Sequence, residues 1–498
     1  MADDNPTEEK DKAEKNGKPE PPKDNLVSTQ HSITIDGKEI KYTVTAGTVV
    51  LKEESGRDVE SEGEKPKAEV FFIAYTKDDV DDPATRPVTF SFNGGPGSSS
   101  VWLHLGLLGP RRVWMDDEGN LPQPPFKLVD NEFSLLDETD LVFIDPVSTG
   151  YSRPVRGEKA RQFHGFKKDI ETVGAFIRLY CTRYLRWLSP KFLIGESYGT
   201  TRAAGLSGHL LERYGLYLNG VMLVSSILNF QTARFAPGND LPYVLFLPTY
   251  AATAWYHKKL ADELQADLRA TLREVEAFAA GEYTLALAKG AALTGDERAE
   301  IVRKLARYTG LSADYIARTN LRIEIFRFTK ELLREQGLTV GRLDTRYKGR
   351  DRDSAGETFE FDPAMAVIMG PYTATFYDYV RRELKFESDL PYEILNGGVW
   401  PWSYAEFENQ YVDVAETLRM AMTRNPYMKV MVNSGYFDLA TPYFATEYTL
   451  SHMGLEEELR GNLEVTYYEA GHMMYVQRAS LAQQKADLAR FVRSAKGG

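Results

Sequence analysis

Short, nearly continuous runs of apolar residues recur along the chain, and Gly, Asp or Asn often bound them. Runs of this kind are typical of strands that are buried on both faces of a largely parallel sheet. The runs occupy residues 88–92, 141–145, 191–195, 220–225, 429–435 and 463–469. Between several of them lie helical patterns, at 161–186 and 200–213. The alternation predicts an α/β fold with a mostly parallel central sheet.

Two segments depart from this alternation. Residues 40–51 and 68–76 are rich in β-branched and aromatic residues, which predicts a β-hairpin region before the parallel strands. From 238 to 395 the chain carries helix formers with apolar residues at helical spacing and no clear strand. We therefore expect a mainly helical insertion that caps the sheet.

These patterns divide the chain into four parts. Residues 1–28 form a charged, Pro-containing tail with few apolar residues, which we expect to be disordered. Residues 29–237 and 396–498 form the two parts of the sheet-bearing core, and the helical cap of 238–395 lies between them. The tail is compatible with a cytoplasmic protein and with a terminus exposed by signal-peptide cleavage.

Composition narrows the class of protein. The chain has 498 residues, of which 43% are apolar, so a large core can form. The net charge of −12 argues against a nucleic acid or an anionic membrane as partner. Cys181 is the single cysteine, so no intrachain disulfide can form. No stretch is long and apolar enough to span a membrane.

The segment KFLIGESYGT contains the strongest chemical signal. An apolar strand leads into Gly195-Glu196-Ser197-Tyr198-Gly199, and a helical pattern follows. This is the strand, sharp turn and helix context of the G-x-S-x-G nucleophile elbow of α/β-hydrolases. Ser197 is therefore the expected nucleophile.

A serine nucleophile needs a histidine base, which in this fold follows it in the chain. His209, His257, His452 and His472 lie beyond Ser197. The first two fall in predicted helices, and His452 lies at a predicted helix end. His472 follows the last predicted strand in a loop with Gly beside it, where such sheets place catalytic groups. We expect His472 to be the base.

The acid that orients the base should lie between the serine and the histidine. Asp438 follows the strand at 429–435 and precedes the histidine-bearing strand. Asp145 also ends a strand, but it precedes the serine in the chain. Asp438 is therefore the expected acid.

The loop FNGGPGSSS follows the strand at 88–92 and contains three glycines. α/β-Hydrolases take one oxyanion donor from a Gly-rich loop after an early strand, and the other from the residue after the nucleophile. We expect the backbone N–H groups of Gly95 and Tyr198 to be these donors. A phosphate-binding role is weak, because no Gly-Lys-Ser/Thr follows the glycines.

Together these residues resemble the serine carboxypeptidase family. The likeness rests on NGGPGSSS (93–100), GPRRV (109–113), VFIDPVSTGYS (143–152), GESYG (195–199), GYFDLATP (435–442) and EAGHMMY (469–475). The resemblance implies removal of C-terminal residues from peptides without a metal or cofactor. It also implies that Asn93, the Gly94 backbone and Glu196 bind the free α-carboxylate of the substrate. Glu196 must be protonated to do so, because two carboxylates repel each other.

The sequence departs from the family at the carboxylate site. The family usually has a second glutamate after the glycine loop, and Leu107 occupies the aligned position. Arg111 or Arg112 is a hypothetical substitute in carboxylate binding, although a surface or loop-anchoring role for both is the simpler interpretation. An esterase or acyltransferase with the same triad stays the alternative, because fold and triad do not determine the acyl group. A catalytically dead binding protein is disfavoured, since all three triad positions are filled.

From the family we also expect a periplasmic or secreted location and a peptide as the partner. The cap should decide which side chains are accepted. Its sequence does not say which these are, nor does it predict the oligomeric state.

Overall fold

A computed structural model describes residues 21–54 and 63–497, and in them the central feature is a ten-stranded mixed sheet. Nine strands follow the order β1-β2-β3-β7-β4-β9-β10-β13-β14, and β8 pairs with β3. The strands are β1 (Asn25–Ile35), β2 (Lys38–Glu54), β3 (Glu64–Lys77), β4 (Val88–Phe92), β7 (Asp140–Ile144), β8 (Arg153–Pro154), β9 (Lys191–Ser197), β10 (Gly220–Ser226), β13 (Lys429–Gly435) and β14 (Leu463–Tyr468).

The sheet has an antiparallel part and a parallel part. Strands β1, β2 and β3 form an antiparallel meander, and β3 joins β7 in antiparallel fashion. From β7 to β14 every neighbouring pair is parallel. The parallel strands match the apolar runs to within two residues at either end. Their carboxyl ends lie at one edge of the sheet, where ligands of such folds bind.

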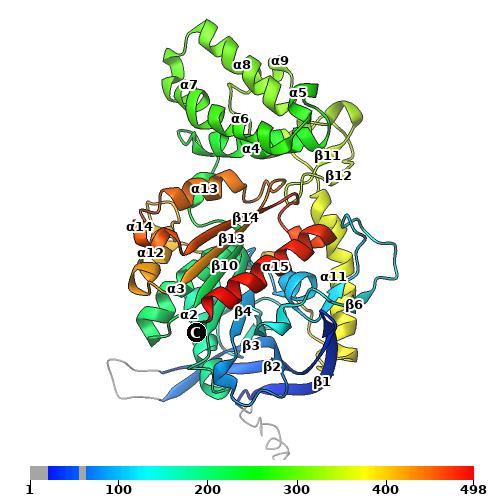
Figure 1. The fold of residues 1–498 in the computed structure, drawn as a ribbon, viewed down its shortest axis with the longest axis vertical. Coiled ribbons are helices and arrows are strands. Elements are labelled where there is room, and N and C mark those ends of the chain that lie inside the picture. Colours follow the sequence, from blue (N-terminus) through cyan, green and yellow to red (C-terminus); the bar gives the residue numbers. More distant parts are fainter. Residues whose placement is uncertain (1–20, 55–62, 498) are drawn as a thin grey trace, which may run out of the picture.

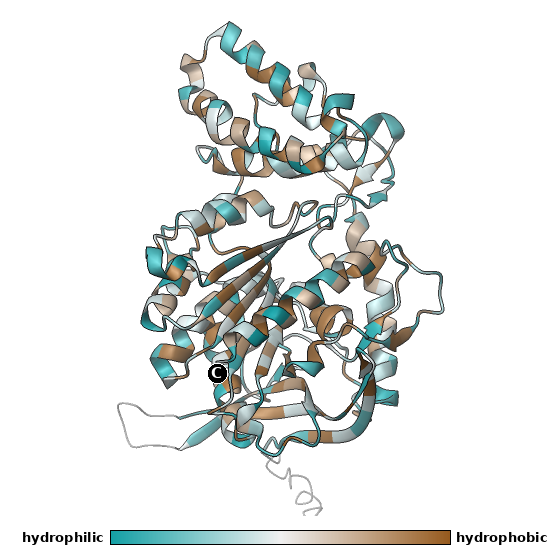
Figure 2. Ribbon diagram, viewed as in Figure 1, coloured by the Kyte–Doolittle hydropathy of each residue, from teal (hydrophilic) through white to brown (hydrophobic). Residues whose placement is uncertain are grey.

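Two hydrophobic cores cover the two faces of the sheet. Helices α2 (Phe166–Arg183), α3 (Tyr198–Tyr214) and α12 (Ala415–Arg424) pack on one face. Helices α11 (Pro363–Arg382) and α15 (Arg478–Ala495) pack on the other. Successive residues of β9 alternate between the cores, with Ile194 in one and Leu193 in the other. The central strands are accordingly mostly brown in Figure 2.

The insertion predicted for 238–395 contains two parts. Its first helices form a layer beyond the carboxyl ends of the strands (Figure 1), and their apolar core also includes residues that follow β13, among them Phe437 and Leu439. Helix α11 lies in the second part and packs against the sheet. The first part consists of α4 (Leu241–Tyr256), α5 (Asp262–Gln265), α6 (Leu268–Phe278), α7 (Thr284–Lys289), α8 (Gly295–Thr309), α9 (Ala313–Arg318) and α10 (Ile325–Glu331).

Two short strand pairs lie outside the sheet. Strand β5 (Arg111–Val113) pairs with β6 (Leu128–Asp130), and β11 (Thr339–Val340) pairs with β12 (Lys348–Gly349). The β11–β12 pair lies between the cap helices and the core in Figure 1. The segment that joins β11 to β12 therefore reaches the carboxyl edge of the sheet.

The start of the chain differs in part from the sequence-based expectation. Of the predicted tail of 1–28, residues 1–20 lie outside the described part. Residues 25–28 begin β1, whose polar residues alternate with partly buried ones against β2. The first residues of β1 are held by pairing with β2, and only Ile33 and Ile35 near its end are buried in the core, so composition alone did not reveal where the strand begins. Within the described residues no helix is long and apolar enough to cross a membrane.

Candidate active site

Ser197 lies at a sharp turn between β9 and α3. Its backbone has φ 61° and ψ −131°, a conformation that non-glycine residues rarely adopt and that marks strained functional turns. A Cβ on Gly195 would come within 2.1 Å of the Gly199 carbonyl oxygen, so the turn requires glycine at this position. The strained turn is the predicted nucleophile elbow.

The glycine loop after β4 packs directly against this elbow. A Cβ on Gly94 would lie 2.4 Å from the Tyr198 backbone nitrogen, and one on Gly199 would lie 2.9 Å from the Phe92 carbonyl oxygen. Gly95 has φ +99°, which favours glycine as well. The missing side chains therefore let the backbone at Gly94 lie against that of Tyr198, next to Ser197 and with Gly95 directly after it in the loop.

A buried arginine, Arg202, contacts both the glycine loop and the elbow. Arg202 Nη1 donates to the Asn93 carbonyl oxygen at 2.5 Å, and Nε donates to Asp169 Oδ2 at 2.8 Å. The guanidinium also lies over the rings of Phe92 and Tyr198, at 5.3 and 5.2 Å from their centroids. Since Arg202 is only 1% exposed, these contacts hold the loop and the elbow in a dry environment.

His472 and Asp438 form a buried pair. His472 Nδ1 donates to Asp438 Oδ2 at 2.8 Å, which leaves Nε2 as the proton acceptor. The carboxylate also accepts hydrogen bonds from Thr441 Oγ1 at 2.6 Å and from the Ala440 backbone nitrogen at 2.7 Å. A carboxylate with this many donors can orient a histidine without taking its proton.

The electrostatics of the pair favour charge separation. Burial opposes the charge of His472, but the attraction of Asp438 and the hydrogen bond to it outweigh this and raise the pKa of His472. Burial likewise opposes the charge of Asp438, but His472 and the Thr441 hydrogen bonds lower the pKa of this carboxyl. The arrangement therefore favours a protonated imidazole at His472 beside an ionised Asp438.

The loop that carries His472 is held from both the core and the cap segment. Ser225 Oγ, at the end of β10, donates to the His472 carbonyl oxygen at 2.6 Å. The His472 backbone nitrogen donates to the Leu343 carbonyl oxygen at 2.7 Å, and that of Gly471 donates to Asp344 Oδ2 at 3.1 Å. The imidazole therefore rests on a fixed backbone.

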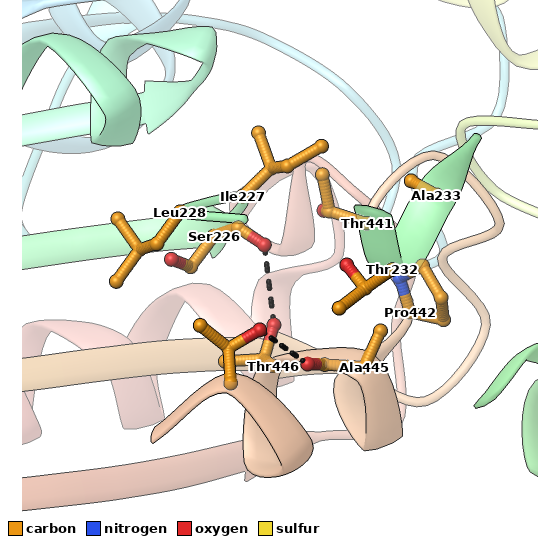
Figure 3. Close-up of a pocket in the computed structure, with 10 residues that line it drawn as sticks. Ser226, Ile227, Leu228, Thr232, Ala233, Thr441, Pro442, Ala445 and Thr446 are labelled. Atoms are coloured by element: carbon orange, nitrogen blue, oxygen red, sulfur yellow. Dashed lines mark hydrogen bonds between the residues drawn. The ribbon is translucent and has the colours of Figure 1, made fainter. Parts of the chain in front are cut away.

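The loop that carries Asp438, residues 436–442, here called the acid loop, is connected to the sheet through α13 (Tyr443–Ser451). Thr446 Oγ1 donates to the Ser226 carbonyl oxygen at 3.1 Å, and Figure 3 shows the two residues facing each other across a small pocket. Thr441 lines the same pocket. Because Thr441 also bonds Asp438, the end of β10 and the acid loop form one supported unit.

Glu196 precedes the nucleophile and is 3% exposed. Asn93 Nδ2 donates to its Oε1 at 2.9 Å, and the Tyr475 hydroxyl donates to its Oε2 at 2.6 Å. Burial raises the pKa of Glu196 to about 7, while His472 and the two hydrogen bonds act in the opposite direction. Glu196 can therefore carry a proton in mildly acidic solution and donate a hydrogen bond to an anion.

A cavity of about 600 Å³, here called the large cavity, brings most of these groups together. It is of the size that binds small ligands. Of the residues singled out in the sequence, its lining contains Asn93, Gly94, Gly95, Glu196, Ser197 and His472. Asp438 lies behind His472, and Tyr198 lines an adjoining cavity that Ser197 and Gly95 share.

Several contributors were not apparent from the sequence. Tyr475 supplies a hydrogen bond to Glu196, and Arg202 joins the two backbone segments. Both act on residues far away in the chain, so no local motif reveals them. Leu107 is buried in the core and does not line the large cavity.

The two arginines considered as substitutes for the second glutamate are engaged elsewhere. Arg111 pairs with Asp130 and with Glu383, and Arg112 lies 3.4 Å from Glu132. Neither lines the large cavity among the residues that the structure describes. Their geometry fits the simpler interpretation, that they anchor loops.

Comparison with known proteins identifies relatives of the chain. The model of the family "Serine carboxypeptidase" matches residues 47–482. The pheromone-processing carboxypeptidase KEX1 of Saccharomyces cerevisiae is 32% identical over 160 residues, which are 31% of this chain and 20% of that protein. Carboxypeptidase Y homolog A of Podospora anserina is 32% identical over 119 residues, 24% of this chain and 19% of the relative. The chain thus covers about a fifth of the length of these relatives.

A solved structure extends the likeness to the whole fold. The prohormone-processing carboxypeptidase Kex1(Δ)p of Saccharomyces cerevisiae matches with a TM-score of 0.54 at 15% identity, over 90% of this chain and 91% of that one. The predicted α/β-hydrolase fold is therefore confirmed.

Proposed function

Because this chain belongs to the serine carboxypeptidase family, we propose that it hydrolyses C-terminal residues from peptides through an acyl-enzyme intermediate. One observation carries the proposal. Beside Ser197, in the same cavity, lies a buried carboxyl that Asn93 and Tyr475 hold in place and whose pKa burial raises to about 7. An ordinary esterase has no need for such a group, whereas a carboxypeptidase must recognise a free carboxylate.

In the first half of the reaction, Ser197 Oγ attacks the scissile carbonyl carbon while His472 Nε2 takes the hydroxyl proton. Asp438 stabilises the resulting imidazolium. The negative charge moves to the carbonyl oxygen, and the backbone N–H groups of Gly95 and Tyr198 stabilise it. The C–N bond then breaks, and His472 gives its proton to the leaving amine.

In the second half a water molecule replaces the amine. His472 removes a proton from this water as it attacks the ester carbonyl of the acyl-enzyme. The tetrahedral intermediate collapses, the bond to Ser197 Oγ breaks, and the serine regains its proton from His472. The products are the shortened peptide and the free C-terminal amino acid.

Substrate binding uses the protonated form of Glu196. Its hydroxyl, the Asn93 side chain and the Gly94 N–H group would donate to the substrate α-carboxylate. This arrangement places the C-terminal residue in the large cavity. It also accounts for the absence of a second glutamate, because Tyr475 already bonds one oxygen of Glu196.

The test is hydrolysis of one N-blocked dipeptide offered as free acid, amide and ester, with Ser197→Ala as the blank. We expect the free acid to be preferred over the amide, most strongly at acidic pH. Cleavage of the ester alone, indifferent to a free carboxylate, would instead identify an esterase or acyltransferase. Equal turnover with Ser197→Ala would exclude Ser197 as the nucleophile.

A further inference from the structure

A second cavity of about 270 Å³ opens on the other side of the elbow, and we call it the arginine cavity. It shares Gly95, Pro96, Ser197, Arg342, Trp400 and Ala440 with the large cavity. Its further lining consists of Tyr198, Ile227, Phe230, Ala233, Arg234, Phe246, Ile325, Tyr404, Leu439 and Thr441. A peptide with its scissile carbonyl at Ser197 can therefore extend into both cavities.

The proposed carboxylate site determines the direction of the peptide. Asn93 and Glu196 line the large cavity but not the arginine cavity. If the C-terminal residue lies in the large cavity, the residue on the acyl side of the scissile bond must lie in the arginine cavity. The side chain of the penultimate residue is therefore the one that this cavity contacts.

The charged residues that line the arginine cavity are all positive among those that the structure describes. Arg234 and Arg342 line it, whereas no Asp or Glu does so among the described residues. Neither guanidinium forms an ion pair or a side-chain hydrogen bond with any residue in the described part of the chain, although Arg234 lies 5.5 Å over the Phe230 ring. Other arginines of this region are paired, as Arg322 is with Asp240 at 2.6 Å.

Arg342 is the better placed of the two. It is half-buried, whereas Arg234 is exposed. Its backbone is fixed, because the Arg342 N–H donates to Asp362 Oδ1 at 3.2 Å and its carbonyl oxygen accepts from the Leu439 N–H at 3.0 Å. The nearby Asp362 carboxylate already accepts three backbone N–H groups. Asp362 attracts the Arg342 charge but forms no ion pair with its guanidinium in the described residues, and a half-buried guanidinium without a hydrogen-bonded counter-ion favours an anionic ligand.

We propose that the arginine cavity selects peptides whose penultimate residue is Asp or Glu, and that Arg342 is the residue that binds this side-chain carboxylate. The inference rests on the proposed carboxypeptidase function and names its substrate class. A planar guanidinium can bind a carboxylate through two parallel hydrogen bonds. Lys or Arg at the same position of the substrate would be repelled by two cations.

The test measures kcat/KM at pH 6 for N-blocked dipeptides X-Leu with a free C-terminus, where X is Glu, Gln, Leu or Lys. Glu and Gln have nearly the same shape, so their ratio isolates the charge. A charge-assisted hydrogen bond predicts a preference for Glu over Gln of about ten- to hundredfold. The ratio also cancels any general effect on His472, whose pKa Arg342 tends to lower.

The variants locate the preference. Arg342→Ala should bring the Glu/Gln ratio close to one, and Arg342→Glu should favour Lys. Arg234→Ala should lower the ratio in part. Arg350→Ala is the matched control, since Arg350 is an exposed arginine just beyond β12 that lines neither cavity, and it should keep the wild-type ratio. Thermal unfolding of each variant verifies that it is folded.

The outcomes separate the two proposals. If the wild type hydrolyses none of the X-Leu peptides, the carboxypeptidase function fails, and this inference with it. If it hydrolyses them with equal efficiency for Glu and Gln, only the inference is wrong. A Glu/Gln ratio that survives in Arg342→Ala, with all free acids slowed equally, would instead assign Arg342 to the terminal carboxylate and overturn its role in the arginine cavity.

Discussion

Replacing Glu196 with Gln should remove the pH dependence of free-acid recognition. Glu196 has a pKa raised to about 7 by burial, and it is proposed to donate a hydrogen bond to the substrate carboxylate. Its proton is lost as the pH rises through 7, after which two carboxylates face each other. The amide of Gln keeps a donor at every pH.

The size of the effect follows from the titration. With a pKa of about 7, roughly nine-tenths of Glu196 is protonated at pH 6 and roughly one-tenth at pH 8. The ratio of kcat/KM for a free-acid peptide to that for its amide should therefore fall about tenfold between these values. In Glu196→Gln this ratio should vary little over the same range.

The assay compares an N-blocked dipeptide with its C-terminal amide between pH 5 and 8.5. Both substrates need neutral His472 as the base, so the ratio cancels the titration of this group. The amide alone should become a better substrate as the pH rises, because deprotonation of His472 is favoured. A tenfold fall of the acid/amide ratio that persists in Glu196→Gln would show that ionisation of Glu196 does not cause this pH dependence.

Three further changes test the supporting contacts. Tyr475→Phe removes a hydrogen bond that lowers the pKa of Glu196. The pH at which the acid/amide ratio has fallen by half should therefore be higher in this variant. A lower or unchanged midpoint would contradict the role of Tyr475. Asp438→Asn should lower kcat by about 10⁴-fold at pH 7, measured on peptide and ester substrates, and a loss below tenfold would exclude Asp438 as the orienting acid. Gly94→Ala places a Cβ 2.4 Å from the Tyr198 nitrogen, so it should displace this oxyanion donor and cost about 10²–10³ in kcat on both peptide and ester. Loss on the peptide alone would show that the change disturbs only the Gly94 contact with the carboxylate and leaves the oxyanion donors in place.

Much of the fold was predictable because the signals are local. The apolar runs of the parallel strands reflect burial on both faces, which each strand experiences wherever it lies in the sheet. The elbow at Ser197 was recognisable because a strained turn demands small neighbours at fixed positions. Strand β1 was not predicted, since it pairs with β2 along its whole length but has few apolar residues, of which only Ile33 and Ile35 are buried in the core.

The candidate site was predictable where one segment carries a whole role, and not where two segments share it. The glycine loop, the elbow, Asp438 and His472 each lie in a short motif. By contrast, Tyr475 bonds Glu196 from a distant segment, and the arginine cavity combines Arg234 with Arg342 from the segment between β11 and β12, so no single motif reveals either arrangement.

Leu107 illustrates why a missing motif residue is weak evidence of a missing function. From the sequence, the absence of a second glutamate removes a partner from Glu196. In the structure Glu196 has two partners, and the Tyr475 hydroxyl occupies one of its oxygens at 2.6 Å. A tyrosine donates to a carboxylate without adding a second negative charge at the site, so burial is the main cause that raises the pKa of Glu196, and the charge of Asp438 adds only a smaller contribution. A variant that adds an acid at Leu107 would bury a carboxyl in the hydrophobic core, and would therefore destabilise the protein rather than restore the family arrangement.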